Sequence, residues 1–110
     1  MKKDLRIKKN EEFSKIISQK KSISNATFVF YLSIKKQNHA RVGISVSKKL
    51  GKAVVRNKIK RQIRMMFQDI FDFESYKYDV ICIVRNKYLC QEYDNNKHEL
   101  EKLIKKAIID

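Results

Sequence analysis

Between residues 53 and 71, apolar side chains recur at steps of three and four positions. On a helix this spacing gathers them on one side, so the pattern predicts a long helix from Ala53 to about Phe71 that packs against a core. The predicted apolar face consists of Val55, Ile59, Ile63, Met66, Phe67 and Ile70.

Two other segments have a helical pattern. Asn10 is followed by two acidic residues, which predicts a short helix that Asn10 caps and that ends near Lys20. Asn96 and Glu99 resemble a capping box at the start of a C-terminal helix. The apolar positions are Phe13, Ile16 and Ile17 in the first helix, and Leu100, Leu103, Ile104, Ala107 and Ile108 in the last.

Alternating polar and apolar residues predict strands in segments 27–36 and 41–47, joined by a turn. The inward side chains are Phe28, Phe30, Leu32 and Ile34 in the first strand, and Val42, Ile44 and Val46 in the second. Residues 78–84 form a continuous apolar run, which is typical of an inner strand. The path from segment 41–47 through the long helix to residues 78–84 predicts a β-α-β crossover, and parallel strands are compatible with it.

The two alternating strands are expected to be neighbours, and their other face carries small and hydroxyl side chains around one aromatic ring. Its members are Val29, Tyr31, Ser33, Gly43, Ser45 and Ser47. With Phe13 and Ile17 as a wall and Tyr31 as a floor, this face is suited to stacking single-stranded nucleic acid, at about 1–3 kcal/mol per base. The pattern fits equally well with Phe13 simply packing the first helix onto the sheet.

Positive charge is concentrated in the first two thirds of the chain. The sequence has 110 residues, 26 basic and 12 acidic, and a net charge of +14. Between Phe13 and Gln68 there are 14 Lys and Arg residues and no Asp or Glu, so the other 12 basic residues balance all 12 acidic ones elsewhere. This segment is therefore the one expected to bind an anionic partner such as nucleic acid.

The start of the long helix is the most basic part. Gly51 stands where a cap residue is expected, and cations near a helix N-terminus cost about 0.3–1 kcal/mol each. The cations are Lys48, Lys49, Lys52, Arg56, Lys58, Lys60, Arg61 and Arg64. This arrangement predicts a phosphate-binding site. The alternative is an ordinary solvated face, which usually mixes both signs of charge.

Length and composition predict one domain, residues 1–110, with residues 1–9 as a mobile basic arm. Neither the two cysteines nor the two histidines have the spacing of a metal site. With no apolar segment of membrane-spanning length and no signal sequence, a cytoplasmic protein is expected. Asp69, Asp72 and Glu74 are the one acidic cluster that suggests a protein nuclease, although they read more simply as solvated carboxylates.

Residues Lys52–Arg64, KAVVRNKIKRQIR, resemble the signature AVxRNxxKRxxR of the protein subunit of bacterial ribonuclease P, which they match from Ala53 onward. Three further segments resemble that family in the same order: RIKKNEEFSKI, FVFY and RVGISVSKKLG. The resemblance covers about residues 6–90. One departure is Ile17, where family members commonly carry a second aromatic residue.

The resemblance implies an α+β fold of order α-β-β-β-α-β-α, a two-layer sandwich with a left-handed crossover. It implies a protein cofactor of a ribozyme, in which the RNA subunit uses Mg²⁺ to remove the 5′ leader of precursor tRNA. By this similarity the RNA subunit would be bound by Lys48, Lys49, Lys52, Arg56, Asn57, Lys60, Arg61 and Arg64. The leader would be bound by Phe13, Ile17, Tyr31, Ser33 and Ser45.

No protein catalytic residue, no tightly bound metal and no obligate protein partner are expected. The basic segment itself contains no carboxylate that could hold Mg²⁺ or act as a base. Two alternatives remain beside this interpretation. One is a structural RNA-binding protein such as a ribosomal protein, and the other is a protein nuclease that uses Asp69, Asp72 and Glu74.

Overall fold

The computed structural model describes the backbone of residues 1–109 and the side chains of residues 1–107. The helices are α1 (Asn10–Ser18), α2 (Ala53–Ile70) and α3 (Tyr93–Ile109), with short 3-10 turns at Lys3–Leu5, Lys48–Leu50 and Asn86–Cys90. The strands are β1 (Ser22–Ser24), β2 (Phe28–Ile34), β3 (Val42–Ser45) and β4 (Tyr78–Val84). The predicted α+β architecture and element order are confirmed. None of the described helices is long and apolar enough to cross a membrane.

The sheet has the strand order β1-β2-β4-β3. The central strand β4 pairs with β2 in antiparallel and with β3 in parallel, so the predicted crossover through α2 connects parallel strands. The expectation that the two alternating strands are neighbours is wrong, because β4 lies between them. A strand that is apolar on both faces is most stable in the middle of a sheet. Strand β1, which periodicity did not predict, has only Ile23 as an apolar residue.

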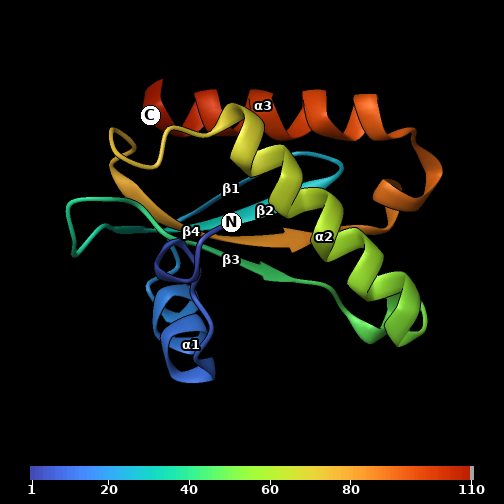
Figure 1. Cartoon of the computed structure of the whole chain (residues 1–110), viewed down its shortest axis with the longest axis horizontal. Coiled ribbons are helices and arrows are strands. Elements are labelled where there is room, and N and C mark those ends of the chain that lie inside the picture. The colour runs from blue at the N-terminus through green and yellow to red at the C-terminus, as the bar shows by residue number, and fades with distance from the viewer. Residues whose placement is uncertain (110) are drawn as a thin grey trace.

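Helices α2 and α3 cover one face of the sheet and α1 lies against the other (Figure 1). The main core is between the sheet and the two long helices, where Phe30 of β2 lies 6.1 Å from Phe67 of α2, measured between ring centroids. Two predicted core positions are wrong. Ile34 is 64% exposed and Val55 is 39% exposed. Ile34 is the last residue of β2 and Val55 lies in the first turn of α2, so each side chain extends past the part of its element that packs in the core.

Two predictions about helix starts are corrected as well. Asn10 is the first residue of α1, and Lys9 takes the cap position without a side-chain cap bond. Helix α3 begins at Tyr93, three residues before Asn96, which the sequence predicted as its cap. Asn96 is instead a buried residue of the first turns, and its Nδ2 donates to the carbonyl of Tyr88 at 3.0 Å. The side chain of Ile108, assigned to the apolar face of this helix, lies outside the described residues.

Residues 1–9, which the sequence predicted to be a mobile arm, pack against the sheet instead. Arg6 forms a parallel bridge with Val42, and the amide of Ile7 donates to the carbonyl of Val42 at 3.0 Å. The Ile7 side chain is buried with Ile16 and Ile81 in a second, smaller apolar cluster under α1. The segment therefore covers an edge of β3 that would otherwise leave backbone groups unpaired.

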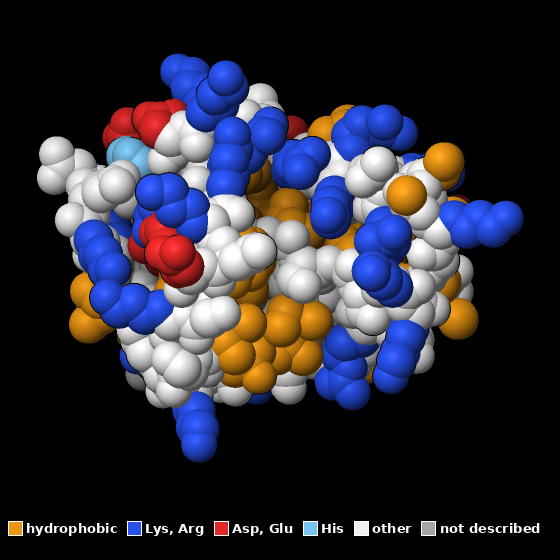
Figure 2. Space-filling model, turned by 90° about the horizontal axis from the view of Figure 1, so that it is seen from below, with side chains coloured by type: hydrophobic (Ala, Val, Ile, Leu, Met, Phe, Trp, Pro, Cys, Tyr) orange, Lys and Arg blue, Asp and Glu red, His pale blue; other side chains and the backbone are white. Residues whose placement is uncertain are grey.

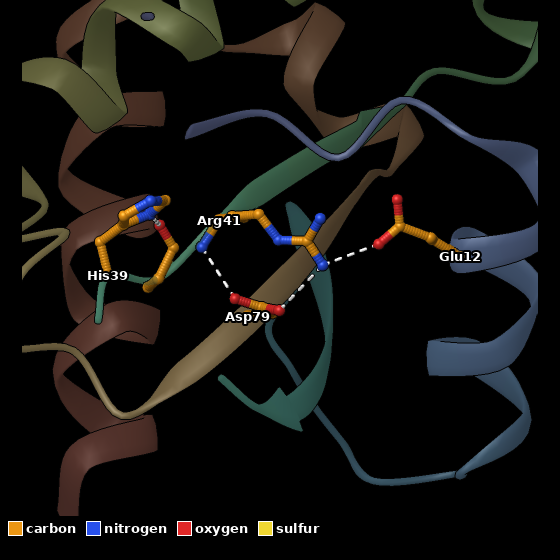
Figure 3. A network of polar contacts seen from close by, with 5 residues as sticks. Glu12, His39, Arg41 and Asp79 are labelled. Atoms are coloured by element: carbon orange, nitrogen blue, oxygen red, sulfur yellow. Dashed lines mark hydrogen bonds and ion pairs between the residues drawn. The ribbon is translucent and has the colours of Figure 1, made fainter. Parts of the chain in front are cut away.

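A polar network fastens α1 to the sheet (Figure 3). Asp79 of β4 accepts hydrogen bonds from the backbone amide of Arg41 at 2.9 Å and from its Nη2 at 3.3 Å. The same Nη2 lies 2.7 Å from Oε2 of Glu12 in α1. The hydrogen bond from Arg41 lowers the pKa of Glu12. Burial alone would lower the pKa of Arg41, but the contacts with Glu12 and Asp79 raise it overall.

We expect the Glu12 contact to stabilise the fold in a pH-dependent way. Because the folded pKa lies below the ordinary value of 4.5, the contribution is present above that pH and is lost as the pH falls through the folded pKa. Glu12→Gln should lower the free energy of unfolding near pH 7 by less than about 1 kcal/mol, since the carboxylate is partly solvated. Urea unfolding at several pH values tests this. The difference from the unsubstituted chain should shrink below pH 4.5, and a constant difference would contradict it.

Candidate nucleic-acid interface

A groove of about 650 Å³ lies on the α1 side of the molecule. It is lined by residues of the N-terminal segment, α1, β3 with Val46 after it, and α2: Met1, Arg6, Ile7, Lys8, Asn10, Phe13, Ser14, Ile17, Val42, Ile44, Ser45, Val46, Lys60 and Arg64. Figure 2 shows this side of the molecule, with hydrophobic side chains exposed in a hollow between two parts of the surface that carry Lys and Arg. The groove thus combines an apolar floor with cationic walls.

Gly43 explains how α1 comes so close to the sheet. A Cβ atom at this position would lie 2.7 Å from Cζ of Phe13 and 2.9 Å from Cδ1 of Ile81. The Phe13 ring therefore lies directly against the backbone of β3, in space that only glycine leaves free. Phe13 packs the helix onto the sheet and also lines the groove. The packing role is thus compatible with a ring that remains accessible from the groove.

Tyr31 and Ile83 continue the apolar surface beyond the groove. Both are partly buried and pack with Phe13 and Ile17 on the cluster of Ile7, Ile16 and Ile81. Ile83 was missed in the sequence because β4 was not placed between the other two strands. The available signal was that alternate residues of a strand face opposite sides of the sheet, which puts Ile83 on the same face as Ile81. In the structure Ile83 pairs with Val29 of β2 and with Ser45 of β3.

Ser33 and Ser45, assigned together from the sequence, lie in different environments. Ser45 is half-buried and lines the groove. Ser33 is 8% exposed and lies beneath α1, in the small space that Arg41 and Asp79 also line. Since α1 covers it, Ser33 is not at the surface that Phe13, Ile17 and Ser45 share.

The cations of α2 differ in exposure. Lys60 and Arg64 are half-buried and line the groove, whereas Lys58 and Arg61 are exposed and do not line it. Asn57 is also exposed and outside the groove lining. None of the cationic side chains of α2 forms an ion pair with a described residue. Their positive charge is therefore available to an external anion.

The turn before α2 adds three more of the predicted residues. Lys48 and Lys49 are exposed in the 3-10 turn, and Lys52 rather than Gly51 is the N-cap of α2. Gly51 has φ 144°, in the left-handed region that favours glycine, and its carbonyl accepts from Nε of Arg56 at 3.2 Å. Arg56 is thus held near the start of the helix.

Two guanidinium groups, those of Arg6 and Arg64, line the groove. Burial and, second, the charge of Arg6 lower the pKa of Arg64. Nη2 of Arg6 donates to the carbonyl of Met1 at 3.1 Å, while its Nε is buried without a hydrogen-bond partner. None of the described residues that line the groove is acidic. Sequence reasoning missed Arg6 because it assigned residues 1–9 to a mobile arm.

The acidic cluster after α2 has local structural roles. Oδ1 of Asp72 accepts from the backbone amides of Glu74 at 3.1 Å and Ser75 at 3.3 Å, and the hydrogen bonds with Ser75 are the main reason that the pKa of Asp72 is lowered. Asp69 forms an ion pair with Lys97 at 3.0 Å. Among the residues that the structure describes, no three His, Cys, Asp or Glu side chains are placed to hold a metal ion.

Comparisons with known proteins agree with this geometry. The family model described as Ribonuclease P matches residues 1–108. The chain belongs to the ribonuclease P protein family. This assignment favours the first of the three interpretations over a ribosomal protein or a protein nuclease, and it supports a role in ribonuclease P.

Individual relatives match along nearly their whole length. The chain is 50% identical over 99 residues to the ribonuclease P protein component of Mesoplasma florum, covering 89% of this chain and 90% of the relative. For the component from a Geobacillus species the identity is 44% over 108 residues, covering 97% and 93%. The solved structure of the Staphylococcus aureus RNase P protein has a TM-score of 0.83 at 42% identity, covering 94% of each chain. The Thermotoga maritima protein has a TM-score of 0.78 at 27% identity, covering 92% and 96%.

We expect Gly43→Ala to destabilise the fold by about 1–2 kcal/mol, because the added methyl group overpacks the contact between Phe13 and the sheet. Urea unfolding of Gly43→Ala, Phe13→Ala and the double variant measures the coupling. The double variant should be more stable than the sum of the two single effects predicts, since removing the ring frees the space. Additive effects would show that Phe13 does not lie on Gly43.

Proposed function

We propose that this chain is the protein cofactor of the ribonuclease P ribozyme in the cytoplasm, where it binds both the catalytic RNA and the 5′ leader of precursor tRNA. The groove carries the proposal, because it joins an aromatic and aliphatic floor to cationic walls without an acidic residue among those described. Single-stranded RNA needs both features, since its bases stack on apolar surfaces and its phosphates need cations.

In this proposal the leader occupies the groove. Phe13, Ile17, Ser45 and the neighbouring Tyr31 contact its bases and sugars. Lys60 and Arg64 of α2, together with Arg6 of the N-terminal segment, bind its phosphates. Ile17 and Ile83 offer aliphatic rather than aromatic contacts, so Phe13 and Tyr31 are the only rings in this apolar cluster on which a base can stack.

The remaining polar and basic residues along α2 and the turn before it bind the RNA subunit. The residues are Lys48, Lys49, Lys52, Arg56, Asn57 and Arg61. Arg56 and Arg61 provide guanidinium forks that match phosphate oxygens. Lys60 and Arg64, which the sequence assigned to the RNA subunit alone, lie on the side that faces the groove and so connect the two RNA surfaces.

The hydrolysis itself is assigned to the RNA subunit with Mg²⁺. The protein's part is to hold the two RNAs and to lower the repulsion between their phosphates. The acidic cluster at the end of α2 supports this division, because Asp72 and Asp69 are engaged in a turn and in an ion pair away from the groove residues.

A processing assay tests the proposal. The purified chain should not cleave precursor tRNA, whereas adding it to the cognate RNA subunit should raise the cleavage rate and lower the Mg²⁺ concentration required. Both reactions are followed by gel separation of the leader from the mature tRNA. Cleavage by the protein without the RNA subunit, or no effect of the protein on the RNA-catalysed reaction, would contradict the proposal.

Two substitutions should separate the two RNA surfaces. Tyr31→Ala should weaken binding of precursor tRNA to the reconstituted complex by about 1–3 kcal/mol and leave binding of mature tRNA unchanged, because only the precursor has a leader to stack. Arg61→Ala should weaken binding of the RNA subunit to the protein and reduce its salt slope by about one unit. Filter binding at several salt concentrations measures both effects. Ile34→Ala, at an exposed apolar position outside the groove, is the matched control for Tyr31.

Equal losses for precursor and mature tRNA in Tyr31→Ala would place Tyr31 in the fold rather than in the leader site. An unchanged salt slope in Arg61→Ala would show that this side chain faces only water.

A further inference from the structure

Few apolar contacts hold α1 on the sheet. The helix has nine residues, and only Ile16 among them is fully buried. Phe13 and Ile17 also pack on the second cluster, but each keeps part of its surface at the groove. The buried part of this cluster consists of Ile7, Ile16 and Ile81, whereas both long helices pack into the larger core. An additional contact therefore has a large effect on where α1 lies.

The polar network supplies that contact at the residue next to Phe13. Oε2 of Glu12 lies 2.7 Å from Nη2 of Arg41, and the two side chains are 30% and 12% exposed. They reach toward each other from α1 and from the start of β3 (Figure 3). Since Glu12 precedes Phe13 in the same helical turn, fixing the carboxylate also fixes the ring on Gly43.

The sheet side of this contact is fixed by β4. Asp79 is 2% exposed, and it holds both the backbone amide and the guanidinium of Arg41. The guanidinium is therefore held before it reaches Glu12, so the contact costs little additional side-chain entropy. Glu12 is also near the positive charges of Lys9 and Lys36, but its hydrogen bond is with Arg41.

We infer that Glu12 and Arg41 are positioning residues for the leader groove: their contact sets where α1 stands above the sheet and so sets the shape of the groove, although neither side chain lines it. This inference rests on the proposed function. The contact acts through Phe13, since the Phe13 ring has no room to move closer to the sheet. Loss of the contact frees α1 to move outward, which widens the site that the leader fills.

Glu12→Ala tests the inference, with Glu11→Ala as its matched control. Both variants remove one carboxylate from the first turn of α1 and change the net charge equally, but Glu11 is exposed and forms no ion pair with a described residue. Affinities for precursor tRNA, mature tRNA and the RNA subunit are measured with the full chain, the tRNA affinities in the reconstituted complex.

We expect Glu12→Ala to weaken precursor binding about three- to tenfold, the range for a single, partly solvated charge contact. Binding of mature tRNA and of the RNA subunit should be unchanged, and Glu11→Ala should match the unsubstituted chain in every assay. Glu12→Gln keeps the reach and an acceptor oxygen, so it should restore part of the lost affinity. A contact that only stabilises the fold would instead reduce all three affinities together.

A second measurement needs no RNA. In ¹⁵N-resolved NMR spectra of the protein, the amide of Gly43 reports the position of the Phe13 ring through its ring current. Glu12→Ala should shift this resonance and Glu11→Ala should not. An unshifted Gly43 amide, or an unchanged ratio of precursor to mature tRNA affinity in Glu12→Ala, would overturn the inference.

The two proposals fail in distinguishable ways. If the unsubstituted chain gives no preference for precursor over mature tRNA, the leader site itself is wrong. If that preference exists and Tyr31→Ala removes it while Glu12→Ala does not, only the role of Glu12 and Arg41 is wrong.

Discussion

Strand β4 must be covered on both faces, and the rest of the structure follows from this requirement. Six of its seven residues are buried, with Ile83 partly exposed. Helices α2 and α3 cover one face completely, whereas the short helix α1 covers only part of the other. The uncovered part of that second face is the apolar surface beside the groove. The same burial that stabilises the sheet therefore creates the surface available to an RNA.

The basic residues that line the groove have no acidic partner among the described residues. Burial and, second, the charge of Arg6 lower the pKa of Arg64, and neither arginine is in an ion pair with a described residue. Arg41 is different, because Asp79 and Glu12 hold it. The fold thus distinguishes a structural arginine, which has carboxylate partners, from arginines that an external anion would stabilise. Like charges held together in this way lower the stability of the free protein and favour binding of a polyanion.

The docked N-terminal segment gives the groove its fourth side. Residues that look unpatterned in the sequence pair with Val42 and bury Ile7, and this places Arg6 opposite α2. Two surfaces that looked separate in the sequence, the basic helix and the alternating strands, meet there. Lys60 and Arg64 belong to both, because they are part of the basic helix and also line the groove.

The sequence by itself determined the local structure and the family. The helical period of residues 53–70, the alternation in β2 and β3, and the apolar run of β4 each depend on neighbouring residues, so they could be read without a fold. The ordered motifs predicted ribonuclease P, as the family model confirms. Only the tertiary structure decided that β4 separates β2 from β3, that Ser33 is buried while Ile83 is only partly buried, and that Arg6 and Arg64 line the same groove. These features depend on pairing between residues far apart in the chain, where a shift of one strand changes every neighbour, and no local pattern records that choice.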